Sequence, residues 1–435
     1  MKEHSSKIEK LIKELCPDGV EFKMLSDIAF VSGAGVDKKI NSNEKEVILL
    51  NYMDVYRNKY IDSSIPKMKV TATDNKIRDC NVLKGDIFIT PSSEVLNDIG
   101  NSAVITEDMD NVVYSYHIMR IRLKEENFIT SMFINYVFES DFIQSQINRN
   151  AKGITRFGLT KTQWEKIQIP IPPLEIQEEI VKILNEFTEL EAELEAELER
   201  RKKQYEYYRN FLLTFDRADS DNLTDRQTDR QTDRQTEVKW LTLGDIGTMI
   251  RGSGLQKKDF TEEGVGCVHY GQIYTYYGTF ADKTKSFVSL ELSRKLKKAK
   301  KGDVLIAGVS ENIEDVCKPL GWLGDEICIS GDMFAFRHNQ NTKYITYLLQ
   351  TTDFQKYKER YAQGTKVIRV KSEKILDYKI PIPPLSKQKE IVSILDKFEK
   401  LVNDISIGLP AELNARRKQY EYYRNKLLTF KEYGA

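Results

Sequence analysis

The sequence predicts an α+β fold in which two pseudo-symmetric globular domains are separated by two long antiparallel helices that form a coiled coil. Three observations support this prediction. The chain repeats itself in matching order, each repeat opens with a region of short β-rich runs, and each repeat closes with a long helical segment. A chain of 435 residues is also too long for one ordinary hydrophobic core, so at least two domains are expected.

The internal duplication is the strongest feature. Ile-Pro-Ile-Pro-Pro-Leu occurs at 169–174 and again at 380–385. Arg-Lys-Lys-Gln-Tyr-Glu-Tyr-Tyr-Arg-Asn at 201–210 returns with one change at 416–425. Two such near-identities in the same order indicate two copies of one domain-plus-helix unit, and hence a pseudo-two-fold molecule within one chain.

The regions before these repeats have the pattern of mixed α+β domains. Runs rich in β-branched and aromatic residues occur at 86–90, 112–116 and 304–307, and Gly, Asn and Asp separate them. Helical patches lie between such runs, at 133–146 and 344–361. We therefore expect a globule of both strands and helices in each half.

The repeated segments predict long helices. From Ile176 to Phe215 the chain has no Gly or Pro, and apolar residues recur at coiled-coil spacing over about 60 Å of helix. An isolated helix cannot bury such a stripe, so the two copies are expected to pack on each other. The alternative, a helix lying on its own domain, fits less well because the helix is longer than a domain face. Gly408 and Pro410 should interrupt the second helix.

These patterns give the following domain boundaries. We expect a first globular domain at 1–167, a first helical spacer at 168–223, a linker at 224–236, a second globular domain at 237–378 and a second helical spacer at 379–435.

Composition limits the class of protein. Lys and Arg together number 66, as do Asp and Glu, so no global positive field holds the chain on nucleic acid, although a local basic surface is allowed. No stretch reaches the length of a membrane span, and the N-terminus lacks a secretory pattern. The five Cys are scattered, which favours neither disulfides nor zinc. We expect a cytoplasmic protein.

Catalytic patterns are missing from the sequence. It has four His, no His-Glu-x-x-His, no phosphate-binding loop and no Asn/Asp-Pro-Pro-Tyr/Phe of an amino-methyltransferase. Asp303, in Lys-Gly-Asp, could be a nuclease carboxylate. Asp86 stands in the same frame in the first half, and a turn before a buried strand accounts for both. We predict no catalytic residue and no metal site.

Matched polar and basic positions in the two halves predict DNA contacts, because such side chains reach base edges and phosphates. Any one of them could also belong to a solvated loop. The predicted DNA-binding residues are Lys38, Lys39, Asn51, Tyr52, Lys152, Thr155 and Arg156 in the first half, and Lys257, Lys258, Tyr270, Gln272, Thr365, Lys366 and Arg369 in the second. The basic run 294–301 fits a phosphate-tracking surface and a solvated helix face equally well.

Across nearly its whole length the chain resembles the specificity subunit of type I restriction-modification systems. Leu-Cys-Pro-Asp-Gly-Val at 15–20 and the two doubled motifs carry the resemblance. It implies that the two globular domains are target-recognition domains, and that each reads one half of a split DNA site. It also implies that the helices set the spacing and dock two methyltransferase subunits, which restriction and translocase subunits join. Those partners use S-adenosylmethionine, ATP and Mg²⁺, and this chain is expected to bind no cofactor.

Three further interpretations concern the repeated tyrosines, a short repeat in the first helix and the linker. The repeated tyrosines are predicted to bind partner subunits; they are Tyr205, Tyr207, Tyr208, Tyr420, Tyr422 and Tyr423. Glu-Ala-Glu-Leu occurs twice at 191–198 and resembles a spacing repeat, although it is also simply good helix composition. The linker 224–236 repeats Thr-Asp-Arg-Gln, as a four-base DNA repeat read in triplets would, which predicts phase variation by slippage.

Rival function classes are a single-chain nuclease or methyltransferase and a coiled-coil adaptor without DNA contact.

Overall fold

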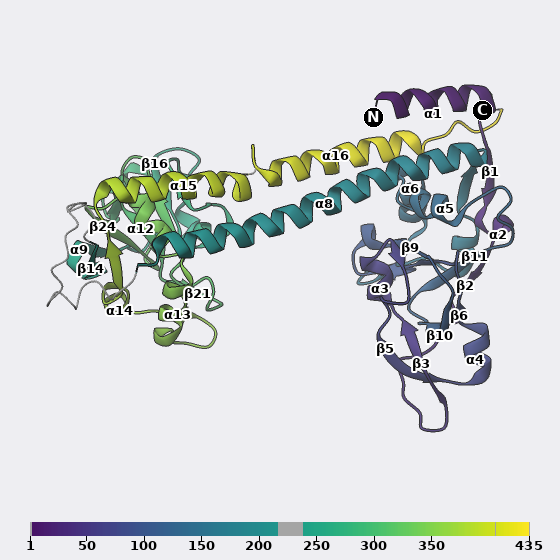
Figure 1. Cartoon of the computed structure of the whole chain (residues 1–435), viewed down its shortest axis with the longest axis horizontal. Helices are drawn as coiled ribbons and strands as arrows, with labels where there is room; N and C mark the ends of the chain where they lie inside the picture. Colours follow the sequence, from purple (N-terminus) through teal and green to yellow (C-terminus); the bar gives the residue numbers. More distant parts are fainter. Residues whose placement is uncertain (1, 216–237, 405, 435) are drawn as a thin grey trace, which may run out of the picture. The chain divides into compact units, whose positions relative to one another are not determined.

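A computed structural model describes residues 2–215, 238–404 and 406–434 of the chain (Figure 1). The linker 224–236 lies outside the described residues. The chain divides into two compact units. Unit 1 comprises 1–193 and 414–435, and unit 2 comprises 194–413. Each unit therefore joins one globular half to segments of both long helices, and each is described by itself.

Unit 1 contains two main β-sheets with a mixed strand order. The five-stranded sheet has the order β2 (Ala29–Ser32), β11 (Met119–Leu123), β7 (Ile87–Ile89), β9 (Ser102–Ile105) and β4 (Tyr60–Ile61). The four-stranded sheet has the order β5 (Met68–Ala72), β3 (Lys45–Leu50), β10 (Met109–Tyr114) and β6 (Asn81–Val82). Two small antiparallel pairs join β1 (Glu21–Met24) to β13 (Gln168–Ile171), and β8 (Ser92–Ser93) to β12 (Phe157–Gly158).

Unit 2 repeats this topology strand for strand. Its five-stranded sheet has the order β15 (Gly247–Arg251), β24 (Met333–His338), β20 (Val304–Ala307), β22 (Pro319–Trp322) and β17 (Phe280–Ala281). Its four-stranded sheet has the order β18 (Ser286–Val288), β16 (Val265–Val268), β23 (Ile327–Ile329) and β19 (Lys298–Ala299). The small pairs are β14 (Lys239–Thr242) with β26 (Lys379–Ile382), and β21 (Val309–Ser310) with β25 (Ile368–Arg369). The predicted pseudo-symmetric α+β fold is confirmed.

Short helices complete each unit. Unit 1 has α1 (Lys2–Leu15), α2 (Leu25–Ile28), α3 (Tyr52–Arg57), α4 (Asp74–Asp79), α5 (Ser131–Phe138), α6 (Asp141–Asn150), α7 (Lys161–Glu165) and the 3₁₀ turn η1 (Leu96–Asp98). Unit 2 has α9 (Leu243–Ile246), η3 (Lys257–Asp259), α10 (Tyr270–Thr275), α11 (Leu290–Ser293), α12 (Thr342–Leu348), α13 (Thr352–Tyr361) and α14 (Ser372–Leu376). The patch predicted as one helix at 133–146 is split, because the Ser140 hydroxyl caps a new helix by accepting from Ile143 N–H.

The Lys-Gly-Asp turns have the structural role that their common frame suggests. Asp86 and Asp303 are almost completely buried. Asp86 accepts two hydrogen bonds of 2.6 Å from the Arg122 guanidinium, and Asp303 accepts bonds of 3.1 and 2.8 Å from Arg337. Each carboxylate also accepts a backbone N–H at the start of its turn. A bidentate buried pair of this kind fixes the turn before a core strand.

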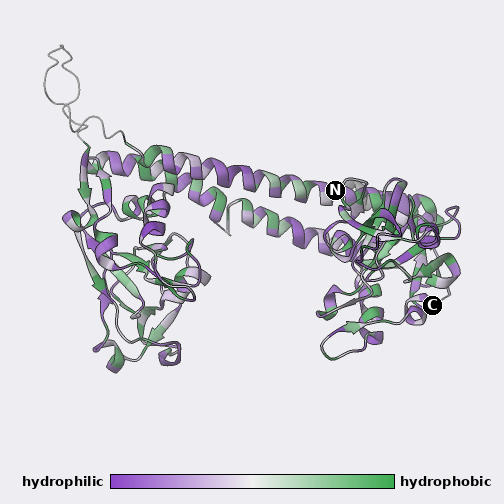
Figure 2. Cartoon of the chain, turned by 90° about the horizontal axis from the view of Figure 1, so that it is seen from below, coloured by the Kyte–Doolittle hydropathy of each residue, from purple (hydrophilic) through white to green (hydrophobic). Residues whose placement is uncertain are grey.

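The long helices match their predicted bounds closely. α8 runs without interruption from Leu174 to Leu213, and hydrophobic residues recur along its mainly hydrophilic ribbon (Figure 2). The second copy is divided into α15 (Leu385–Asn403) and α16 (Leu409–Leu427), as Gly408 and Pro410 predict. A Cβ on Gly408 would lie 2.4 Å from Lys400 O, so a side chain cannot fit at this break. Ile405 of the predicted stripe lies outside the described residues.

Within each unit the two helix segments are antiparallel. In unit 1, Phe187 of α8 stacks on Tyr423 of α16, and Glu191 pairs with Arg417. As residue numbers rise along α8, the numbers of the contacting residues on α16 fall, so the two segments run in opposite directions. In unit 2, Tyr205 and Tyr208 of α8 both stack on Phe398 of α15. None of the helices in the described part of the chain is long and apolar enough to cross a membrane.

Candidate nucleic-acid interface and helix surfaces

Two equivalent loops carry five of the residues that the sequence predicts to bind DNA. In unit 1, Lys152, Thr155 and Arg156 are exposed on the loop between α6 and β12. In unit 2, Thr365 and Lys366 are exposed on the loop between α13 and β25. A backbone bridge closes each loop, one between Lys152 and Gly158 and the other between Gln363 and Arg369. Both units therefore present a short, closed loop with basic and hydroxyl side chains.

A glycine with positive φ shapes each of these loops. Gly153 has φ +148°, and a Cβ there would lie 1.8 Å from Arg156 O. Gly364 has φ +110°, and a Cβ there would lie 2.1 Å from Val367 O. Any other residue would have to open the loop, so glycine holds the tight conformation that directs the neighbouring side chains outward.

In unit 1 the structure brings the distant residues Lys38 and Arg156 close to His117. Burial lowers the pKa of His117, and the positive charges of Lys38 and Arg156 lower it further. The adjacent Tyr116 ring is half exposed and lies 4.0 Å from the His117 ring, centroid to centroid. Lys39 is also exposed and forms an ion pair of 2.7 Å with Asp37. A basic cluster beside an exposed aromatic ring is suited to contact phosphates and bases.

Unit 2 places its basic residues differently. Lys257 and Lys258 are exposed on η3, and Lys257 lowers the pKa of the buried His269, after burial as the larger cause. Arg369 is exposed on β25 and lines a depression with Arg251 and Lys371. The basic run 294–301 is not a helix face, because α11 ends at Ser293 and the run continues through a turn into β19.

Four of the predicted residues lie at the start of a helix, where they hold the fold. Asn51 caps α3, because its side-chain oxygen accepts from Met53 N–H at 2.9 Å. Tyr52 is half-buried and stacks on Tyr56. Tyr270 begins α10, and its backbone N–H donates to Ser330.

Gln272 differs from the other predicted DNA contacts because it is buried. Its side-chain oxygen accepts from His269 N–H, and its amide nitrogen donates to Ser286. Both ends of the amide are thus bonded within the protein, and it presents no free edge to a base. The capping-box spacing, His269 to Gln272, could have revealed this role.

The sequence reading missed an apolar element of the same surface. Ile154, at the tip of the first loop, is 94% exposed between basic and hydroxyl neighbours. Val367 occupies the second loop and is half exposed. Apolar side chains contact thymine methyl groups in many protein–DNA interfaces. An isolated apolar residue inside a polar loop was the available signal.

The six repeated tyrosines fall into three pairs by environment. Tyr205 and Tyr420 point into polar networks inside their units, as described below. Tyr208 and Tyr423 stack on Phe398 and Phe187. Tyr207 and Tyr422 are 62% and 64% exposed. The third pair is thus the most exposed of the three, in line with tyrosines that go round the helix.

Comparison with known proteins identifies the family. The model of the type I restriction modification DNA specificity domain matches residues 17–200 and 236–415, which is most of the chain. The chain belongs to this family. It is accordingly a specificity subunit, a non-catalytic component of type I restriction-modification systems. The predicted resemblance is confirmed.

Relatives and a solved structure agree with this assignment. The specificity subunit of the type I restriction enzyme EcoR124I/EcoR124II of Escherichia coli is 34% identical over 63% of this chain and 67% of the relative. A candidate type I restriction enzyme specificity subunit of Haemophilus influenzae is 36% identical over 64% and 68%. A chain from a structure concerning complex assembly and conformational transition of the type I R-M system shares the fold. Its TM-score is 0.61 at 18% identity, over 95% of this chain and 98% of that one.

The titratable residues do not gather into a metal site within the described ranges. No group of three or more His, Cys, Asp and Glu side chains there could hold a metal ion. All five cysteines are free thiols. Burial raises the pKa of the Cys267 and Cys317 thiols to about 12.

Proposed function

We propose that each unit of this specificity subunit reads one half of a bipartite DNA site. The observation that carries the proposal is the repeated topology with equivalent closed loops, which present Lys152, Thr155 and Arg156 in unit 1 and Thr365 and Lys366 in unit 2. Two copies of one reader on one chain suit two half-sites. We propose the domain boundaries given in the sequence analysis for the two readers and the spacers.

Replacing 237–378 with the corresponding domain of a family member whose next helix carries the same residues at the positions of Asp396 and Glu399 tests this proposal. The methylated sequence should change in one half-site and stay the same in the other. The control is the reciprocal replacement of 1–167, which should change the opposite half. A change in both half-sites after either replacement would contradict independent reading. Methylome sequencing of cells that carry the hybrid gene, together with the methyltransferase, gives the result.

We further propose that the chain directs adenine methylation or restriction by partner subunits. Two methyltransferase subunits and the restriction and translocase subunits supply the chemistry with S-adenosylmethionine, ATP and Mg²⁺, and this chain binds none of these. The relatives' names, which include a restriction enzyme specificity subunit, support this division of labour. DNA cleavage or methylation by the purified chain alone would favour the enzyme alternative. Absence of any salt-dependent DNA binding, even with methyltransferase present, would favour the adaptor.

The helices are proposed to set the half-site spacing and to dock the methyltransferase through the exposed tyrosines. Tyr207 and Tyr422 occupy equivalent helix positions and bury less than half of their surface in the described structure. Changing both to Glu should abolish methyltransferase co-purification, because charge is costly in a buried contact. Changing both to Phe keeps the ring and serves as the control. Intact co-purification of the Glu variant would remove the assignment.

The linker 224–236 is proposed to vary in the population. A four-base unit read in triplets closes after twelve bases, which matches the four-residue period of Thr-Asp-Arg-Gln. Gain or loss of one unit would shift the frame after the first helix, and the shortened product could pair with a second copy to read a palindromic site. Sequencing the tract from many single colonies tests this. Codons that spell no tetranucleotide repeat, or one invariant length, would exclude it.

A further inference from the structure

Each globular half is joined to the helix that follows it by contacts that both units share. Gln177 of α8 accepts from Thr130 N–H and donates to Pro172 O. Its counterpart Gln388 of α15 accepts from Asn341 N–H and donates to Pro383 O. These bonds involve backbone groups, so they would form with either globular half.

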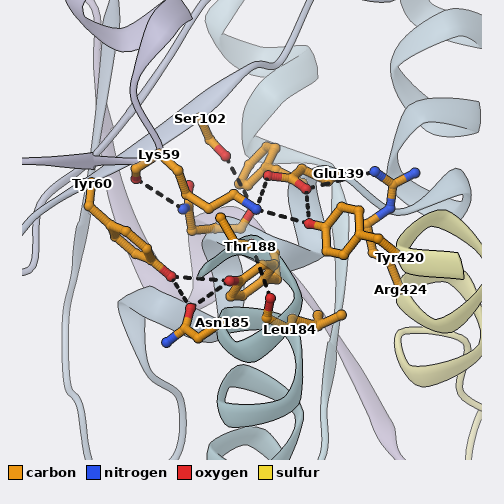
Figure 3. Close-up of polar contacts among 12 residues, drawn as sticks. Lys59, Tyr60, Ser102, Glu139, Leu184, Asn185, Thr188, Tyr420 and Arg424 are labelled. Atoms are coloured by element: carbon orange, nitrogen blue, oxygen red, sulfur yellow. Dashed lines mark hydrogen bonds and ion pairs between the residues drawn. The ribbon is translucent and has the colours of Figure 1, made fainter. Parts of the chain in front are cut away.

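A second set of contacts is specific to unit 1 (Figure 3). The Lys59 ammonium lies 2.7 Å from Glu139 and donates to Tyr420 at 2.9 Å, and Tyr420 in turn donates to Glu139 at 2.8 Å. Burial lowers the pKa of Lys59 and raises that of Tyr420. The globular half thus supplies both the cation and the carboxylate at this point.

The hydrogen bonds that helix α8 makes to the unit 1 network come from neutral side chains. Asn185 accepts hydrogen bonds from the hydroxyls of Tyr60 and Tyr136, both at 2.5 Å. The Thr188 hydroxyl donates to Leu184 O within the helix. Figure 3 shows these residues below the charged group, on the face of α8 that meets the globular half.

In unit 2 the carboxylates come from the helix instead. Asp396 of α15 pairs with Lys343 at 2.6 Å and accepts from the Tyr347 hydroxyl at 2.8 Å. Glu399 accepts from the hydroxyls of Tyr205 at 2.7 Å and Thr279 at 2.6 Å. The globular half therefore supplies a cation and hydroxyls, and α15 supplies the negative charge.

The sequence repeat makes these residues direct counterparts. Asp396 and Glu399 stand at the positions of Asn185 and Thr188, while Lys343, Gln350 and Thr279 stand at those of Met132, Glu139 and Lys59. Tyr205 and Tyr420 are equivalent, as are Arg209 and Arg424. The repeated Tyr and Arg are thus common to both networks, and the carboxylates change sides.

We infer that the N-terminal part of each long helix carries a charge pattern matched to the globular half that precedes it. The two globular halves therefore cannot be exchanged unless each is moved together with this part of its helix. The second unit's half on α8 would place Lys343 opposite Asn185 and Arg424 opposite Gln350, so neither would keep its present carboxylate. The first unit's half on α15 would bring Glu139 together with Asp396 and Glu399, three carboxylates facing Lys59 and Arg209. These side chains are largely shielded from solvent, so the loss of a charge partner is destabilising.

The exchange unit is therefore the globular half together with the start of its helix. A transfer that ends at the repeated Ile-Pro-Ile-Pro-Pro-Leu would separate the half from its charge partners. A transfer that continues past Thr188 or Glu399 would keep them. The repeated motif at 201–210 and 416–425 serves either half, because its Tyr meets a carboxylate in both networks, while its Arg meets Glu139 in unit 1 and the equivalent Gln350 in unit 2.

The test is a chimera of the full chain in which 239–382 replaces 21–171, so that both copies of the second half are present. Its first unit should unfold roughly 5 °C below the parent's, as expected when partly buried charges lose their partners. Adding N185D and T188E should recover more than half of that loss. The control variant A192D/A196E adds two carboxylates at exposed positions of the same helix and should recover nothing.

Variants of the parent chain keep the inference testable if the chimera does not fold. N185D/T188E should lower the melting temperature of unit 1, and D396N/E399T that of unit 2, with each unit followed by limited proteolysis. Combining E139Q and K59T with N185D/T188E should relieve the loss in unit 1. A chimera as stable without the two helix substitutions as with them, or parent variants that melt like the parent, would overturn the inference.

Discussion

Units 1 and 2 have the same strand order but solve one packing problem with opposite chemistry. Behind the five-stranded sheet of unit 1, Gly100 has φ +84°, and a Cβ there would lie 2.6 Å from the Ile147 side chain. In unit 2 the equivalent positions hold Cys317, also with positive φ, and Lys358. The slender Lys358 stem leaves room for the Cys317 side chain. The difference teaches that the topology tolerates a buried cation where the other unit has an isoleucine.

Lys358 can be buried because its ammonium group is hydrogen-bonded within unit 2. Lys358 is 1% exposed, and its ammonium donates to Glu314 O at 2.6 Å and Val316 O at 2.7 Å. Burial lowers its pKa. The two carbonyls belong to the loop after β21, which this side chain fixes. The equivalent loop of unit 1 is held instead by hydrogen bonds from Thr90 and Asn101 to Asp98 O.

The largest expected loss of stability concerns the buried carboxylates, Asp86 and Asp303, that both units share. Asp86→Ala and Asp303→Ala each remove a buried carboxylate, which is the bidentate acceptor of an arginine and the acceptor of a backbone N–H. Each change should cost its own unit about 3 kcal/mol of stability, measured by denaturation with unit-specific proteolysis. Asp86→Asn and Asp303→Asn keep the shape and should cost less. A large loss in one unit and none in the other would break the proposed equivalence.

A smaller effect should separate the units. Lys358→Ile places the unit 1 residue in unit 2, crowds Cys317 and leaves two carbonyls unbonded, which should cost about 2 kcal/mol. The double variant Cys317→Gly/Lys358→Ile restores the unit 1 pair and should recover part of the loss. Thermal melts of the four chains of this cycle give the coupling energy. Strict additivity would contradict the proposed exchange of packing.

The smallest expected effect is a loss of stability of unit 2 at acid pH, caused by His338. Burial lowers the pKa of His338 to about 4, and its Nδ1 accepts from Gln340 N–H. The unfolded chain binds a proton near pH 6.5 and the folded chain does not, so stability is complete above pH 6.5 and falls as the pH drops toward 4. His338→Leu, which copies Leu123 of unit 1, should flatten the profile. Equal acid sensitivity of the two chains would contradict this.

Much of the fold was predictable from the sequence because the repeats and helix signals are local. The bounds of α8 and the break at Gly408 follow from residue types along one segment. The charge networks were not predictable, since Lys59, Glu139, Asn185 and Tyr420 come from four separate segments. The surface was predicted in part. Loop residues such as Arg156 are exposed, whereas Asn51 and Gln272 serve helix starts, a role that their spacing shares with many capping residues.

The interruption between Asn403 and Leu409 has a consequence for how a gene of this kind can change its product. A four-residue insertion of the Glu-Ala-Glu-Leu type lengthens α8 by about 6 Å and adds about 40° of rotation beyond one full turn. An unbroken second helix would need a simultaneous insertion at the same level to keep its side chains in register. A divided helix has a turn that can shift instead. We therefore expect one mutational event in the first helix to be sufficient, with no second insertion needed in α15 or α16.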